Sequence, residues 1–86
     1  MAAMDRQPLA VTLFSKPGCH LCDVAAHALH NIHNDYPLEI LTVDITSDPS
    51  IYELYRYRIP VVTRGEDVLA EGKVTEFRLR QALDLP

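Results

Sequence analysis

The feature that most constrains this chain is a pair of cysteines, Cys19 and Cys22, between a strand-like and a helix-like segment. Leu9–Phe14 is short, apolar and rich in β-branched and aromatic side chains, which predicts a buried strand. The apolar residues that follow recur at helical spacing: Leu21, Val24, Ala25, Ala28, Leu29 and Ile32. Since Pro17 and Gly18 interrupt the two patterns, Cys19 is expected at the mouth of the helix and Cys22 one turn inside it.

This placement has a chemical consequence for the two thiols. A thiol at a helix N-terminus lies beside unpaired backbone N–H groups, which favour its thiolate form. Two thiols three residues apart on a helix are also close enough to form a disulfide with little backbone motion. We therefore interpret Cys19 as an exposed attacking thiol and Cys22 as a more buried resolving thiol.

Three other interpretations of the cysteines stay open. Inert core cysteines are disfavoured because the pair lies at a Pro-Gly turn rather than on the apolar stripe of the helix. A structural zinc site needs four ligands, but no second Cys-x-x-Cys is present. An iron–sulfur cluster bridged between two chains is the third alternative. Histidines could also serve as zinc ligands, but all of them fall in the same predicted helix: His20, His27, His30 and His33.

The composition limits the classes of partner. With 86 residues the chain has room for one domain, in which residues 1–8 are expected to form a flexible tail. A net charge of -4 argues against nucleic acid and anionic membranes, and no apolar run is long enough to span a bilayer. Two cysteines and no signal peptide suggest a reducing, cytoplasmic location. We expect a monomer.

The remaining elements are predicted from periodicity, capping residues and turn residues. They are strands at about Ala10–Phe14 and Leu38–Ile45, helices at about His20–Asn34, Pro49–Tyr57 and Thr75–Leu85, and a hairpin of Pro60–Thr63 with Val68–Glu71. The first two strands should be parallel neighbours because they flank a helix. The residues expected to face the core on the later helices are Ile51, Leu54, Tyr55, Leu79, Ala82 and Leu83, whereas Arg78 and Arg80 are expected in solvent.

Around the cysteines the chain reads Lys16-Pro17-Gly18-Cys19-His20-Leu21-Cys22-Asp23, a Lys-x-x-Cys-x-Leu-Cys-Asp pattern, and Arg58-Ile59-Pro60-Val61 follows downstream. These motifs give the chain a resemblance to the glutaredoxin-like group of the thioredoxin superfamily. It implies an α/β thioredoxin fold in its minimal glutaredoxin form, βαβ–α–ββ–α, with a four-stranded mixed sheet and helices on both faces.

The resemblance also implies roles for individual residues. Pro60 would be a cis-proline facing the two cysteines, and the backbone of Ile59 would offer an unpaired N–H and C=O to an extended substrate. Lys16 would match the lysine that helps to bind the glutathione carboxylate. Independently of the resemblance, His20 lies next to Cys19 in the sequence and as imidazolium would stabilise its thiolate.

Two departures from the glutaredoxin pattern concern glutathione. The residues between the cysteines are His20-Leu21 instead of Pro-Tyr, and Gly72-Lys73 replaces the Gly-Gly at which the glutamyl end of glutathione binds. We expect the Lys73 side chain to crowd that ligand.

We therefore predict a dithiol–disulfide oxidoreductase that exchanges two electrons between Cys19/Cys22 and a disulfide of a protein or of glutathione. No bound cofactor or metal is expected, because the sulfurs carry the electrons. Glutathione as a co-substrate and a thioredoxin-reductase-type flavoprotein are the two candidate electron donors. The alternative is a thioredoxin-like peptide-binding module without significant redox turnover.

Overall fold

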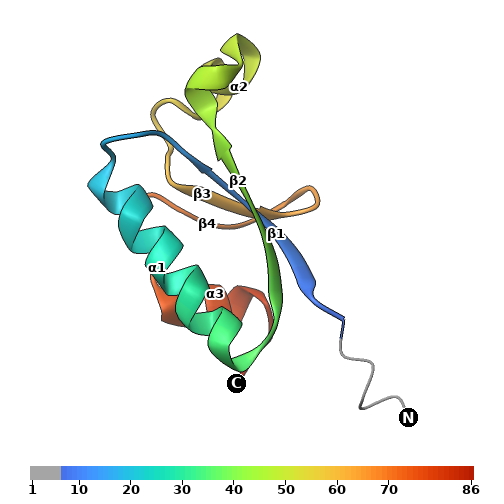
Figure 1. Cartoon of the computed structure of the whole chain (residues 1–86). Helices are drawn as coiled ribbons and strands as arrows, with labels where there is room; N and C mark the ends of the chain where they lie inside the picture. The colour runs from blue at the N-terminus through green and yellow to red at the C-terminus, as the bar shows by residue number, and fades with distance from the viewer. Residues whose placement is uncertain (1–6) are drawn as a thin grey trace.

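The computed structural model describes residues 7–86, so most of the expected tail at residues 1–8 lies outside the described residues. The elements follow the expected order βαβ–α–ββ–α (Figure 1). Their bounds are β1 Leu9–Ser15, α1 His20–Asp35, β2 Leu38–Asp44, a 3-10 helix Ile45–Ser47, α2 Pro49–Tyr55, β3 Val61–Arg64, β4 Asp67–Glu71 and α3 Glu76–Ala82.

Local sequence signals explain where the three helices begin. Gly18 has a φ of 78°, a conformation that favours glycine, and this turn directs the chain from β1 into α1. The Asp48 carboxylate accepts hydrogen bonds from two backbone N–H groups at the start of α2, with Pro49 as the first helical residue. The Thr75 hydroxyl caps α3 in the same way, by accepting from the N–H of Arg78 at 3.1 Å.

The four strands form one mixed sheet in the order β2-β1-β3-β4. The predicted parallel pairing of β1 with β2 is confirmed, and it runs in register from Leu9 opposite Leu38 to Ser15 opposite Asp44. The predicted hairpin of β3 and β4 is also confirmed; its pairing has an irregularity between Val62 and Thr63. Phe14 at the end of β1 lies opposite Val61 at the start of β3.

Most of the hydrophobic core lies between one face of the sheet and the two helices α1 and α3, which lie side by side (Figure 1). Alternate residues of β1 contribute Val11 and Leu13 to this core. Phe14 therefore lies on the other face, where its ring stacks on that of Tyr55 from α2, with centroids 4.3 Å apart. Helix α2 thus reaches the second face only at its end, and lies beyond the sheet for the rest of its length.

Several residues predicted to be in the core are exposed. Leu54 is 62% exposed, and α2 has no buried residue at all, because this helix packs against the preceding 3-10 helix rather than across the sheet. On α1, the side chains of Leu21 and Val24 are 46% and 41% exposed, since the buried stripe runs along a different line of the helix. Ala82 is exposed, whereas Leu79 and Leu83 are buried as predicted.

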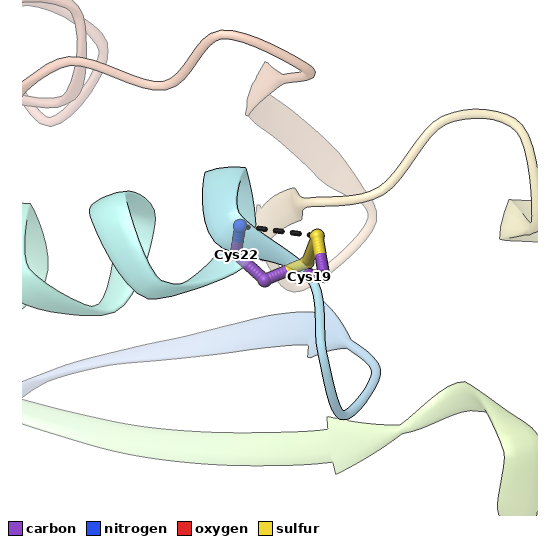
Figure 2. Close-up of a disulfide and its surroundings, with 2 residues drawn as sticks. All are labelled: Cys19 and Cys22. Atoms are coloured by element: carbon purple, nitrogen blue, oxygen red, sulfur yellow. Dashed lines mark hydrogen bonds between the residues drawn. A yellow bond between two sulfur atoms is a disulfide. The ribbon is translucent and has the colours of Figure 1, made fainter.

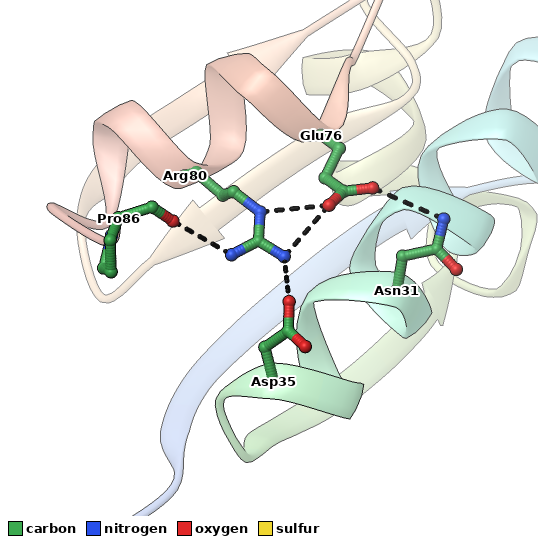
Figure 3. A network of polar contacts seen from close by, with 5 residues as sticks. All are labelled: Asn31, Asp35, Glu76, Arg80 and Pro86. Atoms are coloured by element: carbon green, nitrogen blue, oxygen red, sulfur yellow. Dashed lines mark hydrogen bonds and ion pairs between the residues drawn. The ribbon is translucent and has the colours of Figure 1, made fainter.

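Arg80 was expected in solvent, and the structure contradicts this expectation (Figure 3). Its guanidinium lies 2.6 Å from the carboxylate of Asp35 at the end of α1 and 3.0 Å from that of Glu76 on its own helix. Asn31 of α1 donates to the same Glu76 carboxylate at 3.4 Å. These contacts connect α1 to α3, which is why the Arg80 side chain is largely covered.

Within residues 7–86, no helix is long and apolar enough to cross a membrane.

Candidate active site

Cys19 and Cys22 are joined by a disulfide at the N-terminus of α1, with their Cα atoms 5.2 Å apart (Figure 2). Cys19 is the N-cap residue, with extended backbone, and its Sγ accepts a hydrogen bond from the backbone N–H of Cys22 at 3.1 Å. The Cys19 carbonyl accepts the N–H of Asp23, which is the first bond of the helix. The sulfur of Cys19 therefore occupies the position in which a helix N-terminus receives a capping acceptor.

The two cysteines differ in exposure, as predicted. Cys22 is 3% exposed, while Cys19 is only partly covered. The expectation that the cysteines lie off the apolar stripe is wrong for Cys22, which lies on the buried stripe of α1 with Ala25, Leu29 and Ile32. Its side chain is thus almost completely covered.

Pro60 lies at the same end of the sheet as Cys19. The Ile59–Pro60 peptide bond is cis, as the resemblance implied, and the Pro60 ring is fully buried. Because Phe14 pairs with Val61, Pro60 is the neighbour of Ser15, the last residue of β1 before the turn to Cys19. The Pro60 carbonyl accepts the N–H of Gly72 at 2.8 Å, which attaches the end of β4 to the same place.

The expectation of an unpaired Ile59 N–H is wrong. This group donates to the carbonyl of Tyr55 at 3.1 Å, at the end of α2. The chain leaves α2 in a tight turn, in which the Arg58 N–H donates to the same carbonyl at 2.8 Å. Only the Ile59 carbonyl would be left for an extended substrate.

The side chains of Lys16, His20 and Lys73 are exposed. Lys16 follows β1 directly, and His20 is the first residue of α1, adjacent to Cys19. Lys73 follows Gly72, which has a φ of 72° and is bonded to Pro60. The fold thus brings these three side chains to one end of the molecule, and their predicted roles in binding stay predictions.

Sequence reasoning missed a cluster that holds the segment before Pro60. The Arg58 guanidinium donates two hydrogen bonds to the Glu71 carboxylate, at 2.9 and 3.1 Å, and lies 5.2 Å from the centre of the Tyr55 ring. The hydrogen bonds from Arg58 lower the pKa of the Glu71 carboxyl, and they raise the pKa of Arg58. The pairing could not be read from the sequence, because the two residues are 13 positions apart and meet only when β4 pairs with β3.

Among residues 7–86, no three side chains of His, Cys, Asp or Glu come together in an arrangement that could hold a metal ion. A pocket of about 220 Å³ lies at the other end of β1, far along the strand from the disulfide. It is lined by Gln7, Leu9, Tyr36, Pro37 and Leu85.

Comparisons with known proteins agree with this architecture. Residues 10–84 match the family model of the glutaredoxin-like domain (DUF836). The chain is 30% identical to protein XcR50 from X. campestris, with a TM-score of 0.75 over 86% of this chain and 95% of that one. It is 21% identical to protein Ne2328 from Nitrosomonas europaea, with a TM-score of 0.73 over 91% of this chain and 89% of that one.

A third solved structure is a mutant of the thioredoxin-like protein BC3987. It is 22% identical, with a TM-score of 0.64, over 88% of this chain and 96% of that one. This likeness concerns the fold alone, whereas the family model covers nearly the whole chain, including both cysteines and the cis-proline. The chain belongs to the family of the glutaredoxin-like domain (DUF836).

Proposed function

We propose that this protein is a dithiol–disulfide oxidoreductase whose Cys19/Cys22 pair exchanges two electrons with a disulfide of another protein or of glutathione. The observation that carries the proposal is the position of Cys19, partly exposed at the N-cap of α1 with a backbone N–H directed at its sulfur. The buried Cys22 lies within disulfide-bonding reach. A pair with one accessible and one protected thiol is what a two-step exchange needs.

Reduction of a substrate disulfide takes two steps. In the reduced protein the Cys19 thiolate attacks one sulfur of the substrate disulfide, so that a mixed disulfide forms and the other substrate sulfur leaves as a thiolate, which takes a proton from solvent. Cys22 then loses its proton and attacks the Cys19 sulfur. The second substrate sulfur leaves as a thiol, and the Cys19–Cys22 disulfide of this structure remains. The substrate has gained two electrons from the protein and two protons, one from solvent and one that replaces the proton lost by Cys22.

The backbone supplies the stabilisation that the first step requires. The N–H of Cys22 that bonds the Cys19 sulfur would donate to the thiolate in the reduced protein, and a charge-assisted bond of this kind is stronger than a neutral one. We propose that His20 and Lys16 add positive charge beside Cys19. No resident cofactor is needed for this chemistry. A reducing compartment such as the cytoplasm would keep the pair ready to react.

Cysteine variants test the proposal. Cys19→Ser should abolish disulfide reduction, whereas Cys22→Ser should accumulate mixed disulfides with a model substrate, because the resolving thiol is missing. The measurements are a disulfide-reduction assay and intact-protein mass spectrometry. In the reduced wild-type protein, the pH profile of Cys19 alkylation should lie below that of a free cysteine thiol, whose pKa is about 8.5. If both variants were as active as the wild type, the proposed oxidoreductase activity would be refuted.

The electron donor forms a separate part of the proposal. Either glutathione or a thioredoxin-reductase-type flavoprotein would return two electrons to the disulfide. Lys73→Gly should strengthen glutathione binding several-fold if the lysine side chain obstructs the glutamyl end, and Lys73→Ala tests whether side-chain length alone matters. Calorimetric titration with oxidised glutathione measures both. Unchanged affinity in both variants would remove crowding as the obstacle.

The competing candidate is a thioredoxin-like module that binds an extended peptide without redox turnover. The pairing of the Ile59 N–H with Tyr55 removes one of the two backbone groups on which this alternative depends. Ordinary reactivity of Cys19 in the alkylation profile, together with failure to accept electrons from glutathione and from a thioredoxin-reductase system, would favour the module.

A further inference from the structure

The two edges of the sheet differ in how well they are protected against pairing with another chain. The outer edge of β4 is short, has an irregularity in its pairing, and carries an acidic residue at each end, Asp67 and Glu71. Bulges, charges and short length are the features by which edge strands avoid association. Strand β2, the other edge, has none of these features except two acidic residues.

Strand β2 is seven residues long and pairs with β1 without irregularity over its whole length. It contains no Lys, Arg, Pro or Gly. In the described part of the chain, no strand pairs with its outer side, so alternate residues present N–H and C=O groups there, although the Leu38 N–H at its start already donates to the His33 side chain. Its middle residues Ile40 and Leu41 are 36% and 61% exposed. An exposed apolar edge strand of this length is a site for adding a further strand.

The exposure of Leu41 follows from the position of α2. In the register of the sheet, Leu41 lies beside Thr12, Thr12 opposite Thr63, and Thr63 opposite Val68. These four side chains therefore form one row across the face of the sheet that α1 and α3 leave open. Helix α2 stays at the end of this face, so both ends of the row remain exposed, with Val68 at 47%.

From this edge we propose that the partner of β2 is the β2 strand of a second copy of the chain, in an antiparallel two-fold pairing centred on Leu41. Such a pairing places each acidic residue opposite an uncharged one. The opposed residues would be Leu41 with Leu41, Ile40 with Thr42, Glu39 with Val43, and Leu38 with Asp44. Two Leu41 side chains would then contact each other on the open face, and the two sheets would join into one of eight strands.

The same geometry limits the assembly to a dimer. A two-fold pairing uses the same surface on both chains and closes on itself, whereas pairing of β2 with β4 would leave free edges and continue into fibres. The irregular, acidic edge of β4 opposes that second mode. The interface consists of one strand from each chain, so it falls in the small class, below about 1,200 Å², that is typical of weak complexes.

Sedimentation equilibrium on the full chain, with reductant present to exclude intermolecular disulfides, tests the proposal. Over about 10 µM to about 1 mM, the range for a weak interface, the apparent mass should rise from that of the monomer towards twice that value. Leu41→Lys should weaken association about ten-fold, because it places two like charges directly opposite each other. Val68→Lys, a similarly exposed residue at the other end of the same row, should leave association unchanged.

A charge-complementation experiment tests the register itself. Leu41→Lys and Leu41→Glu should each associate more weakly than the wild type when alone, and a mixture of the two should associate more tightly than either, because unlike charges then face each other. Amide NMR spectra establish that both variants are folded. A wild-type chain that is monomeric up to about 1 mM overturns the proposal. Association of Leu41→Lys as tight as that of the wild type, or a mixture no tighter than its components, does the same.

Discussion

His33 lies in the last turn of α1, and its Nδ1 accepts a hydrogen bond from the backbone N–H of Leu38 at 2.9 Å. Leu38 is the first residue of β2, and its side chain is buried in the core. The imidazole nitrogen serves as the acceptor for an N–H that the strand does not satisfy there. The sequence analysis placed His33 only on the predicted helix and missed this bond.

Replacing His33 with phenylalanine should lower the free energy of unfolding by about 1 kcal/mol, because the Leu38 N–H loses its acceptor and stays partly buried. His30→Phe is the matched control, since His30 is exposed on the same helix. Urea denaturation followed by circular dichroism measures both. Equal effects of the two substitutions would show that the hydrogen bond contributes nothing specific.

Also at the residue scale, the positions of the two cysteines could be predicted from the sequence, whereas the hydrogen bond of the Ile59 N–H could not. The roles of Cys19 and Cys22 depend on neighbours within four residues, which the sequence displays directly. The N–H of Ile59 depends on how the chain leaves α2, and on the Arg58–Glu71 pair that holds that turn. Tyr55, the acceptor of that N–H, is only four residues away, but Glu71 lies 13 positions from Arg58, and no local pattern reports this pairing.

At the scale of elements, α2 and α3 are equal in length and both start at a capped residue, yet they differ in what they bury. Helix α3 places Leu79 in the core, with no exposed surface, and its Arg80 joins the end of α1. Helix α2 buries none of its residues and touches the sheet chiefly through the Tyr55 ring. Removing the N-cap of α3 should therefore lower the stability of the whole fold, whereas removing the N-cap of α2 should destabilise mainly that helix.

Thr75→Ala should lower the global free energy of unfolding by about 1 kcal/mol, the usual value of an N-cap side chain. Asp48→Ala removes an equivalent cap from α2 and should have a smaller global effect, while the amides of α2 exchange faster with solvent. Urea denaturation and hydrogen exchange distinguish the two outcomes. An equal global loss in both variants would mean that α2 unfolds only with the rest of the molecule.

For the whole molecule, the core lies mainly on one side of the sheet. Ala25, Leu29 and Ile32 of α1 have no exposed surface and belong to this core, whereas the open side of the sheet has apolar side chains in solvent. The helices that cover the core side are adjacent, so the stability of the domain depends on that single layer. A chain of 86 residues has little surplus stability with which to absorb a core defect.

Leu29→Ala should therefore cost about 2–5 kcal/mol, because it leaves a cavity in this layer. Leu54→Ala deletes the same atoms from a residue that is 62% exposed, and should change the free energy of unfolding by less than about 0.5 kcal/mol. Both values come from urea denaturation. A large loss for Leu54→Ala would mean that α2 packs against the domain more closely than its exposure indicates.

The sequence by itself determined the order of the elements, the caps of the helices and the position of Cys19 at the mouth of α1. These features depend on periodicity and on capping or turn residues that act within a few positions. Tertiary structure alone decided that α2 lies beyond the end of the sheet, that Arg80 joins two helices, and that the edge of β2 is open. Each of these depends on contacts between segments far apart in the chain, whose free energies are set by packing rather than by local preference.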